Sequence, residues 1–134
     1  ISDKALSVAA KNASRHITDI EFIKSNLFEQ LTGTYDIIVS NPPYIPTGEI
    51  PFLMPEVKDH EPVLALDGTD DGLEFYRRIS SEARKFLRRD GYIFFEIGHN
   101  QGEDVRQILL QYGFTEIMIK KDLSGLDRVV SARG

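Results

Sequence analysis

Apolar residues recur along the chain with two different periods, and these periods predict its elements. Helical spacing predicts three helices, which begin at Ser2, near Leu73 and at Gly102. Short apolar runs predict strands at Ile20–Lys24, Tyr35–Ser40, Tyr92–Ile97, Phe114–Lys120 and Arg128–Ala132. Strands that alternate with helices indicate an α/β fold with a mainly parallel sheet, and the closely spaced final pair adds one antiparallel strand.

Local signals predict where several elements begin and end. Ser2 is a typical N-cap for the first helix. We expect Asp90-Gly91 to close the second helix and Gly113 to follow the end of the third. The uninterrupted apolar run Tyr35–Ser40 is typical of a parallel strand that is covered on both faces.

A long stretch without periodicity runs from Ile45 to Asp71. Prolines and glycines interrupt it too often for a long helix: Pro46, Gly48, Pro51, Pro55, Pro62 and Gly68, with Gly72 just beyond. Loops longer than about 12–15 residues are uncommon in compact domains unless they serve a function. We therefore interpret this stretch as a candidate lid.

The sequence Asn41-Pro42-Pro43-Tyr44 directly follows the apolar run Tyr35–Ser40. In open α/β sheets, ligands bind at the carboxyl ends of the strands, which favours a functional role over a plain strand-ending turn. Proline fixes its own φ and restricts its predecessor, so the motif is rigid. The Asn41 side-chain oxygen and the Pro42 carbonyl can together accept both hydrogens of one planar –NH₂ group, on which Tyr44 can stack. An amide nitrogen held in this way would be aligned with an electrophilic methyl group above it.

Composition narrows the classes of function. The length of 134 residues predicts a single domain, residues 1–134. The net charge is −5 and no basic stripe is visible, which argues against a protein that grips nucleic acid through its phosphates. The absence of cysteine excludes disulfides and thiolate metal sites and fits a reducing cytoplasm. No apolar run approaches the roughly 20 residues that span a bilayer.

Other candidate side chains are weaker signals of a functional site. The three histidines are isolated in sequence, and we expect solvated or structural roles for them: His16, His60 and His99. The segment Asp67–Gly72 resembles the start of a calcium loop, but Arg78 stands where a bidentate glutamate is needed. Glu96, at a strand end, is either a site residue or hydrogen-bonded scaffold. No metal site is expected.

Several segments together carry a resemblance to a known family. Asn41-Pro42-Pro43-Tyr44 resembles the signature of amino-group methyltransferases that use S-adenosylmethionine. With "EVKDHEPVLALDGTDDGLEFYRRI", "GYIFFEIGHNQGEDV" and "KDLSGLDRVV", it resembles the HemK/PrmC family, and the likeness runs from Ile1 to about Arg133. Members of this family methylate the side-chain amide of the glutamine in the GGQ motif of peptide-chain release factors.

The resemblance implies a fold and a set of site residues. The fold is the Rossmann-like fold of class I S-adenosylmethionine-dependent methyltransferases. Asn41–Tyr44 would bind the glutamine amide as the catalytic motif, with Asn41 also near the methyl donor. Asn26 and Leu27 fall where the family has an acidic and then a hydrophobic residue beside the cofactor's adenine. Asn26 departs from that pattern, so it would accept a hydrogen bond from the adenine amino group without carrying a charge.

The glycine-rich turn that normally holds the cofactor in such a domain is not found in this sequence. We therefore expect an N-terminally truncated, partial methyltransferase domain. The missing first strand would lie between Ile20–Lys24 and Tyr35–Ser40. Both edges would then be unpaired, which favours self-association.

The partner implied by the resemblance is a release factor, through its GGQ loop, in the cytoplasm, with no direct contact to nucleic acid or membrane. Two alternatives stay open. A nucleic-acid methyltransferase acting on adenine or guanine amino groups also uses an Asn-Pro-Pro-aromatic site, but it predicts a basic face and a target-recognition segment. A catalytically silent piece would keep the amide pocket and bind S-adenosylmethionine hardly at all.

Overall fold

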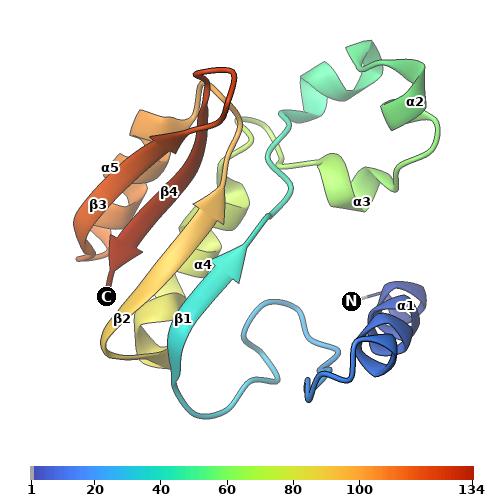
Figure 1. The fold of residues 1–134 in the computed structure, drawn as a ribbon. Coiled ribbons are helices and arrows are strands. Elements are labelled where there is room, and N and C mark those ends of the chain that lie inside the picture. Colours follow the sequence, from blue (N-terminus) through green and yellow to red (C-terminus); the bar gives the residue numbers. More distant parts are fainter. Residues whose placement is uncertain (1) are drawn as a thin grey trace. The chain divides into compact units, whose positions relative to one another are not determined.

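The computed structural model describes residues 2–134, which form two compact units (Figure 1). The first unit ends at Gly33, and the second runs from Thr34 to Gly134. The first contains a single helix, and the second contains a sheet with its covering helices. The predicted motif and its surroundings therefore belong to the second unit.

The first unit is built around helix α1 (Asp3–Arg15). The Ser2 hydroxyl accepts a hydrogen bond from the Ala5 amide at 3.3 Å, which confirms Ser2 as the N-cap. The predicted strand Ile20–Lys24 is wrong, because this segment has no regular secondary structure and pairs with none of the strands among residues 2–134. A strand is defined by hydrogen bonds to a neighbouring strand, and an apolar pattern alone does not supply that neighbour.

Within residues 34–134, four strands form one sheet in the order β1-β2-β4-β3 (Figure 1). Their bounds are β1 (Tyr35–Ser40), β2 (Leu87–Glu96), β3 (Thr115–Lys121) and β4 (Asp127–Arg133). β1 and β2 are parallel, and β4 is antiparallel to both of its neighbours. Three strands therefore point one way and β4 points the other, which confirms the predicted single antiparallel strand. Two of the three pairings are antiparallel, however, so the sheet is mixed rather than mainly parallel.

The core lies between the sheet and two helices, α4 (Glu74–Phe86) and α5 (Gly102–Gln111). The helices pack against each other and cover the same face of the sheet. Alternate residues of β2, and the residue that follows it, are completely buried under them: Ile93, Phe95 and Ile97. Val130 and Ala132 of β4, paired with Phe95 and Ile93, are also fully buried. This arrangement follows from the two-residue period of a strand.

Within residues 34–134 the other face of β1 is exposed, so the prediction that this strand is covered on both faces is wrong for the second unit. Ile38 pairs with Ile93 and shares its face, so its neighbours Ile37 and Val39 point the opposite way. Their side chains are 57% and 74% exposed. β1 is also the end strand of the sheet. A continuous apolar run predicts that a strand forms, but it does not predict which elements cover that strand.

The junction between α4 and β2 also differs from the prediction. The helix ends at Phe86, and the Asp90-Gly91 pair lies inside β2. Tyr35 pairs with Leu87 and Ile37 with Tyr92, so the intervening residues of β2 bulge out of the ladder. Asp90 has a left-handed φ of 66° in this bulge. Pairing with β1 thus begins before the glycine that was expected to close the helix.

Residues 46–66 make an excursion between β1 and α4, beyond the arrowhead of β1 (Figure 1). It contains only short helices: η1 (Thr47–Phe52), α2 (Pro55–Lys58) and α3 (Val63–Leu66). Ile45 and Asp67, at its two ends, pair with each other as a parallel bridge. The expectation that this stretch forms no long helix is confirmed, and its role as a lid stays a prediction.

Candidate active site

The carboxyl ends of β1 and β2 place two loops side by side. Ser40 pairs with Phe95 in the parallel ladder, so both strands end at the same edge of the sheet. Asn41 leaves this edge from β1, and Ile97 and Gly98 leave it from β2. This is the edge at which ligands bind in open α/β sheets.

The four residues of the Asn-Pro-Pro-Tyr motif lie at this edge and differ in their exposure to solvent. Asn41 is exposed, Pro42 is buried, and Pro43 and Tyr44 are half-buried. The buried Pro42 anchors the backbone, while the exposed Asn41 is accessible to a ligand. The two prolines restrict φ along the motif, so its carbonyl groups have little freedom. Recognition of a planar amide by this motif stays a prediction.

The end of the motif is tied to the segment that closes the excursion. The Ile45 amide donates to the Leu66 carbonyl at 3.1 Å, and the Gly68 amide donates to the Ile45 carbonyl at 2.8 Å. The Thr47 hydroxyl donates to Asp67 Oδ1 at 2.7 Å. These bonds hold both ends of the excursion together directly after Tyr44.

Gln101, the residue before α5, contacts the motif itself, and the sequence reasoning missed it. Its Nε2 donates to the Tyr44 carbonyl at 2.9 Å and to the Gly72 carbonyl at 3.3 Å. Its Oε1 accepts from the Gly98 amide at 3.0 Å. A usable signal was present in the sequence: glutamine is a poor N-cap residue, yet it stands at the start of a helix.

Below the motif, Tyr76 of α4 supports the end of β2. Its hydroxyl donates to the Glu96 carbonyl at 2.9 Å, and its ring packs edge-on against Phe95 at a centroid distance of 5.2 Å. Burial, with smaller contributions from Tyr44 and Glu96, raises the pKa of Tyr76 well above its usual value. Tyr76 therefore stays protonated and acts as a hydrogen-bond donor to the backbone. Glu96 contributes its carbonyl to this scaffold.

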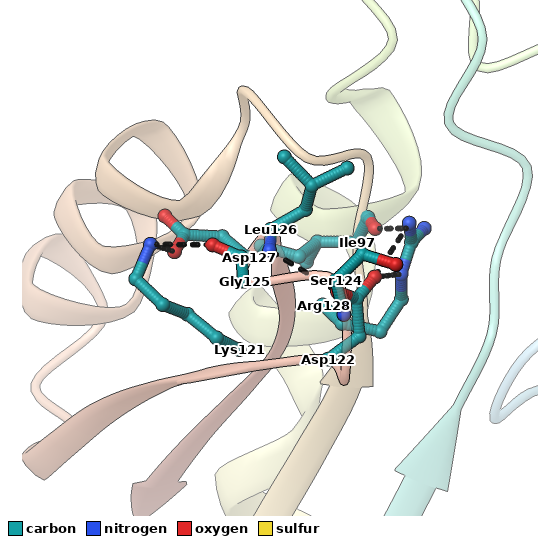
Figure 2. A network of polar contacts seen from close by, with 8 residues as sticks. All are labelled: Ile97, Lys121, Asp122, Ser124, Gly125, Leu126, Asp127 and Arg128. Carbon is teal, nitrogen blue, oxygen red and sulfur yellow. Dashed lines mark hydrogen bonds and ion pairs between the residues drawn. The ribbon is translucent and has the colours of Figure 1, made fainter.

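The turn between β3 and β4 is joined to the same edge by a polar network (Figure 2). Arg128 donates to the Ile97 carbonyl at 3.2 Å and pairs with Asp122 at 3.3 Å. Asp122 also accepts the backbone amides of Ser124 and Leu126 at 2.9 and 3.1 Å. These hydrogen bonds hold the pKa of the Asp122 carboxyl below its usual value. The Leu126 amide lowers it most, and the Ser124 amide and the Arg128 side chain lower it less. The carboxylate thus organises the turn and orients Arg128 toward the loop after β2.

Among the remaining candidates, His99 follows Gly98 in the loop after β2 and Asp67 pairs with Ile45 next to the motif, whereas His60 lies in the excursion. The three histidines are exposed: His16, His60 and His99. Asp67 Oδ1 accepts from the Thr47 hydroxyl, at the other end of the excursion, and from the Thr69 amide within its own turn. In the part of the chain that the structure describes, no group of three metal-ligating side chains is placed to hold an ion. Among those same residues, no helix combines the length and apolar character needed to cross a membrane.

The predicted adenine-side residues lie in the first unit. Asn26 is exposed, and its Nδ2 donates to Glu29 Oε1 at 2.6 Å. Leu27, half-buried, has a left-handed φ of 52° in the same turn. Asn41 lies in the second unit. A cofactor site shared by Asn26, Leu27 and Asn41 therefore stays a prediction.

Comparison with known proteins identifies relatives over nearly the whole chain. It is 48% identical to the release factor glutamine methyltransferase of Agrobacterium fabrum, covering 99% of this chain and 47% of that protein. It is 47% identical to the enzyme of the same name from Fusobacterium nucleatum, covering 99% of this chain and 38% of that protein. The chain thus spans less than half the length of these relatives. The methyltransferase small domain family matches residues 1–52.

The fold has known counterparts as well. A methyltransferase from Pyrococcus furiosus superposes with a TM-score of 0.71 at 16% identity, covering 99% of this chain and 59% of that one. A ribosomal protein L11 methylase from Lactobacillus delbrueckii superposes with a TM-score of 0.64 at 21% identity, covering 99% and 53%. These likenesses confirm the class I methyltransferase fold. Over its matched length, the chain is therefore similar to release factor glutamine methyltransferases.

Proposed function

We propose that this chain carries the substrate-amide site of an S-adenosylmethionine-dependent methyltransferase that acts on peptide-chain release factors. The target atom is the side-chain nitrogen (N5) of the glutamine in the GGQ motif. The observation that carries the proposal is the placement of an exposed Asn41 and a rigid Pro-Pro-Tyr segment at the carboxyl edge of β1. The names of the relatives supply the class of substrate. Action on release factors would place the reaction in the cytoplasm, where translation occurs.

In the proposed reaction the motif binds and orients the amide. The Asn41 side-chain oxygen and the Pro42 carbonyl accept the two N–H groups, and Tyr44 packs on the plane of the amide. Both acceptors polarise the nitrogen and fix its direction of attack, so orientation supplies much of the rate. A nitrogen held in this way would take an electrophilic methyl group, whose bond to the sulfur of the methyl donor would break. The surplus proton on nitrogen then leaves to water.

The methyl group would come from bound S-adenosylmethionine. The side chains present fit this cofactor in part. Asn26 and Asn41 are exposed carboxamides, and their oxygens suit an adenine amino group and the region of the methyl donor. Asn26 is oriented by its contact with Glu29. These side chains can contact a cofactor but do not form the glycine-rich cradle that usually holds one.

The test is methyl transfer together with cofactor binding. S-adenosylmethionine is titrated by calorimetry into this chain and into a version extended N-terminally to the length of the relatives. Both are then incubated with a release factor and with a copy in which the GGQ glutamine is replaced by alanine. Transfer that requires that glutamine supports the proposal. Binding and transfer by the extended protein alone would show that this chain by itself is catalytically silent.

A matched pair of variants tests the site within that assay. Asn41→Ala removes an exposed acceptor and should lower transfer about 100-fold or more. Asn12→Ala, on the exposed surface of α1, should leave transfer unchanged. Equal activity of the two variants would contradict the assigned role of Asn41. Methylation of adenine or guanine in nucleic acid, with none of the release factor, would favour the alternative substrate class.

We also propose that the chain can associate with itself through β1. This strand ends the sheet, and its outward side chains Ile37 and Val39 are exposed. Unpaired strand edges with apolar side chains favour strand addition. Ultracentrifugation should show concentration-dependent dimers, which Val39→Lys should weaken. A chain that is monomeric at all concentrations would refute this part.

A further inference from the structure

One buried side chain joins three segments at the proposed amide site. Gln101 is only 7% exposed, and its carboxamide uses both ends. The nitrogen contacts the carbonyls of Tyr44 and Gly72, and the oxygen accepts the amide of Gly98. The side chain thereby links the end of the Asn-Pro-Pro-Tyr motif to the start of α4 and to the loop after β2.

The surrounding backbone leaves no spare room for this carboxamide. A Cβ atom on Gly72 would lie 2.3 Å from the Tyr44 carbonyl oxygen and 2.8 Å from Gln101 Nε2. A Cβ atom on Gly98 would lie 2.9 Å from Gln101 Oε1. Two glycines are therefore needed for the carboxamide to reach its partners. Such close enclosure allows a single orientation of the side chain.

The stability of helix α5 does not explain why a glutamine occupies position 101. Gln101 occupies the N-cap position of α5, yet its side chain makes no capping hydrogen bond to that helix. Serine, threonine, aspartate or asparagine would stabilise the helix start better than a residue that does not cap it. The side chain is directed to the motif instead.

We infer that Gln101 is a positioning residue for the substrate amide, acting through the backbone of Tyr44. Pro42 and Pro43 restrict φ within the motif, so few soft dihedral angles separate the Tyr44 carbonyl from the Pro42 carbonyl. Fixing the first carbonyl therefore restricts the second, which is the proposed acceptor for the glutamine amide. This inference rests on the proposed function and adds a residue outside the motif to its site.

The experiment compares Gln101→Glu and Gln101→Met with Gln111→Glu in the extended protein. Gln111 lies at the exposed end of the same helix and serves as the matched control. At neutral pH the introduced carboxylate at position 101 faces two carbonyls without a proton to donate. Release-factor methylation should then fall roughly 10- to 100-fold, mainly in kcat, because the bound amide is misaligned. Gln111→Glu should leave it unchanged.

A pH profile separates positioning from simple loss of stability. Burial beside carbonyl oxygens raises the pKa of an introduced carboxyl group. In mildly acidic solution it regains one O–H donor, so Gln101→Glu should recover several-fold relative to the unsubstituted protein. Gln101→Met has no proton to regain and should show no such recovery. A pH profile shared by both variants would overturn the inference.

Hydrogen exchange on the present chain gives a readout that needs no methyl transfer. The Ile45 and Gly68 amides, which tie down the end of the motif, should exchange at least about tenfold faster in Gln101→Met than in Gln111→Glu. Unchanged exchange would overturn the inference even if activity falls. A further outcome separates the two proposals. If Gln101→Met exchanges faster but the unsubstituted protein does not methylate release factors, the positioning role is upheld and the proposed function is rejected. If Gln101→Glu does not fold at neutral pH, the comparison rests on Gln101→Met.

Discussion

Replacing Gly72 by alanine should destabilise the second unit through two separable effects. The residue has a left-handed φ of +73°, and an added Cβ would lie 2.3 Å from the Tyr44 carbonyl oxygen. The chain offers glycines that isolate each effect. Gly125 has a φ of +81° with nothing within 4 Å of an added Cβ, so Gly125→Ala reports the backbone conformation alone. At Gly68 an added Cβ meets the Tyr44 backbone at 2.8 Å without a left-handed φ, so Gly68→Ala reports the crowding alone.

The expected magnitudes follow from these contacts. A left-handed conformation costs a non-glycine residue roughly 1–2 kcal/mol, which is the expectation for Gly125→Ala. Forcing an extra methyl group into a packed site costs roughly 1–3 kcal/mol, which is the expectation for Gly68→Ala. Gly72→Ala combines both effects, and the sum is about 2–5 kcal/mol in the free energy of unfolding.

Urea unfolding followed by circular dichroism provides the measurement, because it yields the free energy of unfolding for each variant. The order Gly72→Ala, then Gly68→Ala, then Gly125→Ala is expected if crowding against Tyr44 exceeds the conformational cost. The essential result is that Gly72→Ala costs more than Gly125→Ala. If the two cost the same, the close approach of Gly72 to Tyr44 is refuted, and with it the enclosure of the Gln101 carboxamide.

Two further predictions concern stability. A hydrogen bond from Arg77 lowers the pKa of the Asp71 carboxyl below its usual 3.8. The pair therefore stabilises the folded protein above pH 3.8, and this stabilisation is lost as the pH falls through the lowered pKa. Because the two side chains are 41% and 48% exposed, Asp71→Asn should remove less than about 1 kcal/mol at neutral pH and make the acid-side loss of stability shallower in urea titrations. Tyr76→Phe should cost roughly 0.5–1.5 kcal/mol in the same assay, because the Glu96 carbonyl loses its donor. An unchanged midpoint for Tyr76→Phe would argue against that hydrogen bond.

Features that depend on neighbours in sequence could be predicted from the sequence. Ser2 caps α1, and Gly113, with a φ of 79°, follows the end of α5, because caps and turns involve residues a few positions apart. The close spacing of the last two strands likewise predicted their antiparallel pairing. The Asn-Pro-Pro-Tyr motif could be placed at the carboxyl edge because it directly follows β1.

Features that depend on partners far away in the sequence could not be predicted from the sequence. Ile20–Lys24 has the composition of a strand but pairs with no strand among residues 2–134. The bulge around Asp90 arises from pairing with Tyr35 and Ile37, more than fifty positions earlier in the chain. The exposure of Val39 depends on which helices cover each face of the sheet. In each case the local pattern is compatible with several outcomes, and the partner selects one.

Gln101 shows the same division within the site. The chemistry of the motif itself could be derived from the donors, acceptors and fixed angles of four consecutive residues. The contact that holds this motif joins Gln101 to Tyr44, fifty-seven positions away. Only the packing of α5 and α4 against the sheet brings these residues together. The sequence alone determined which groups can recognise an amide, whereas the tertiary structure decided which side chain holds them in place, because a hydrogen bond of this length requires backbones brought close by the whole fold.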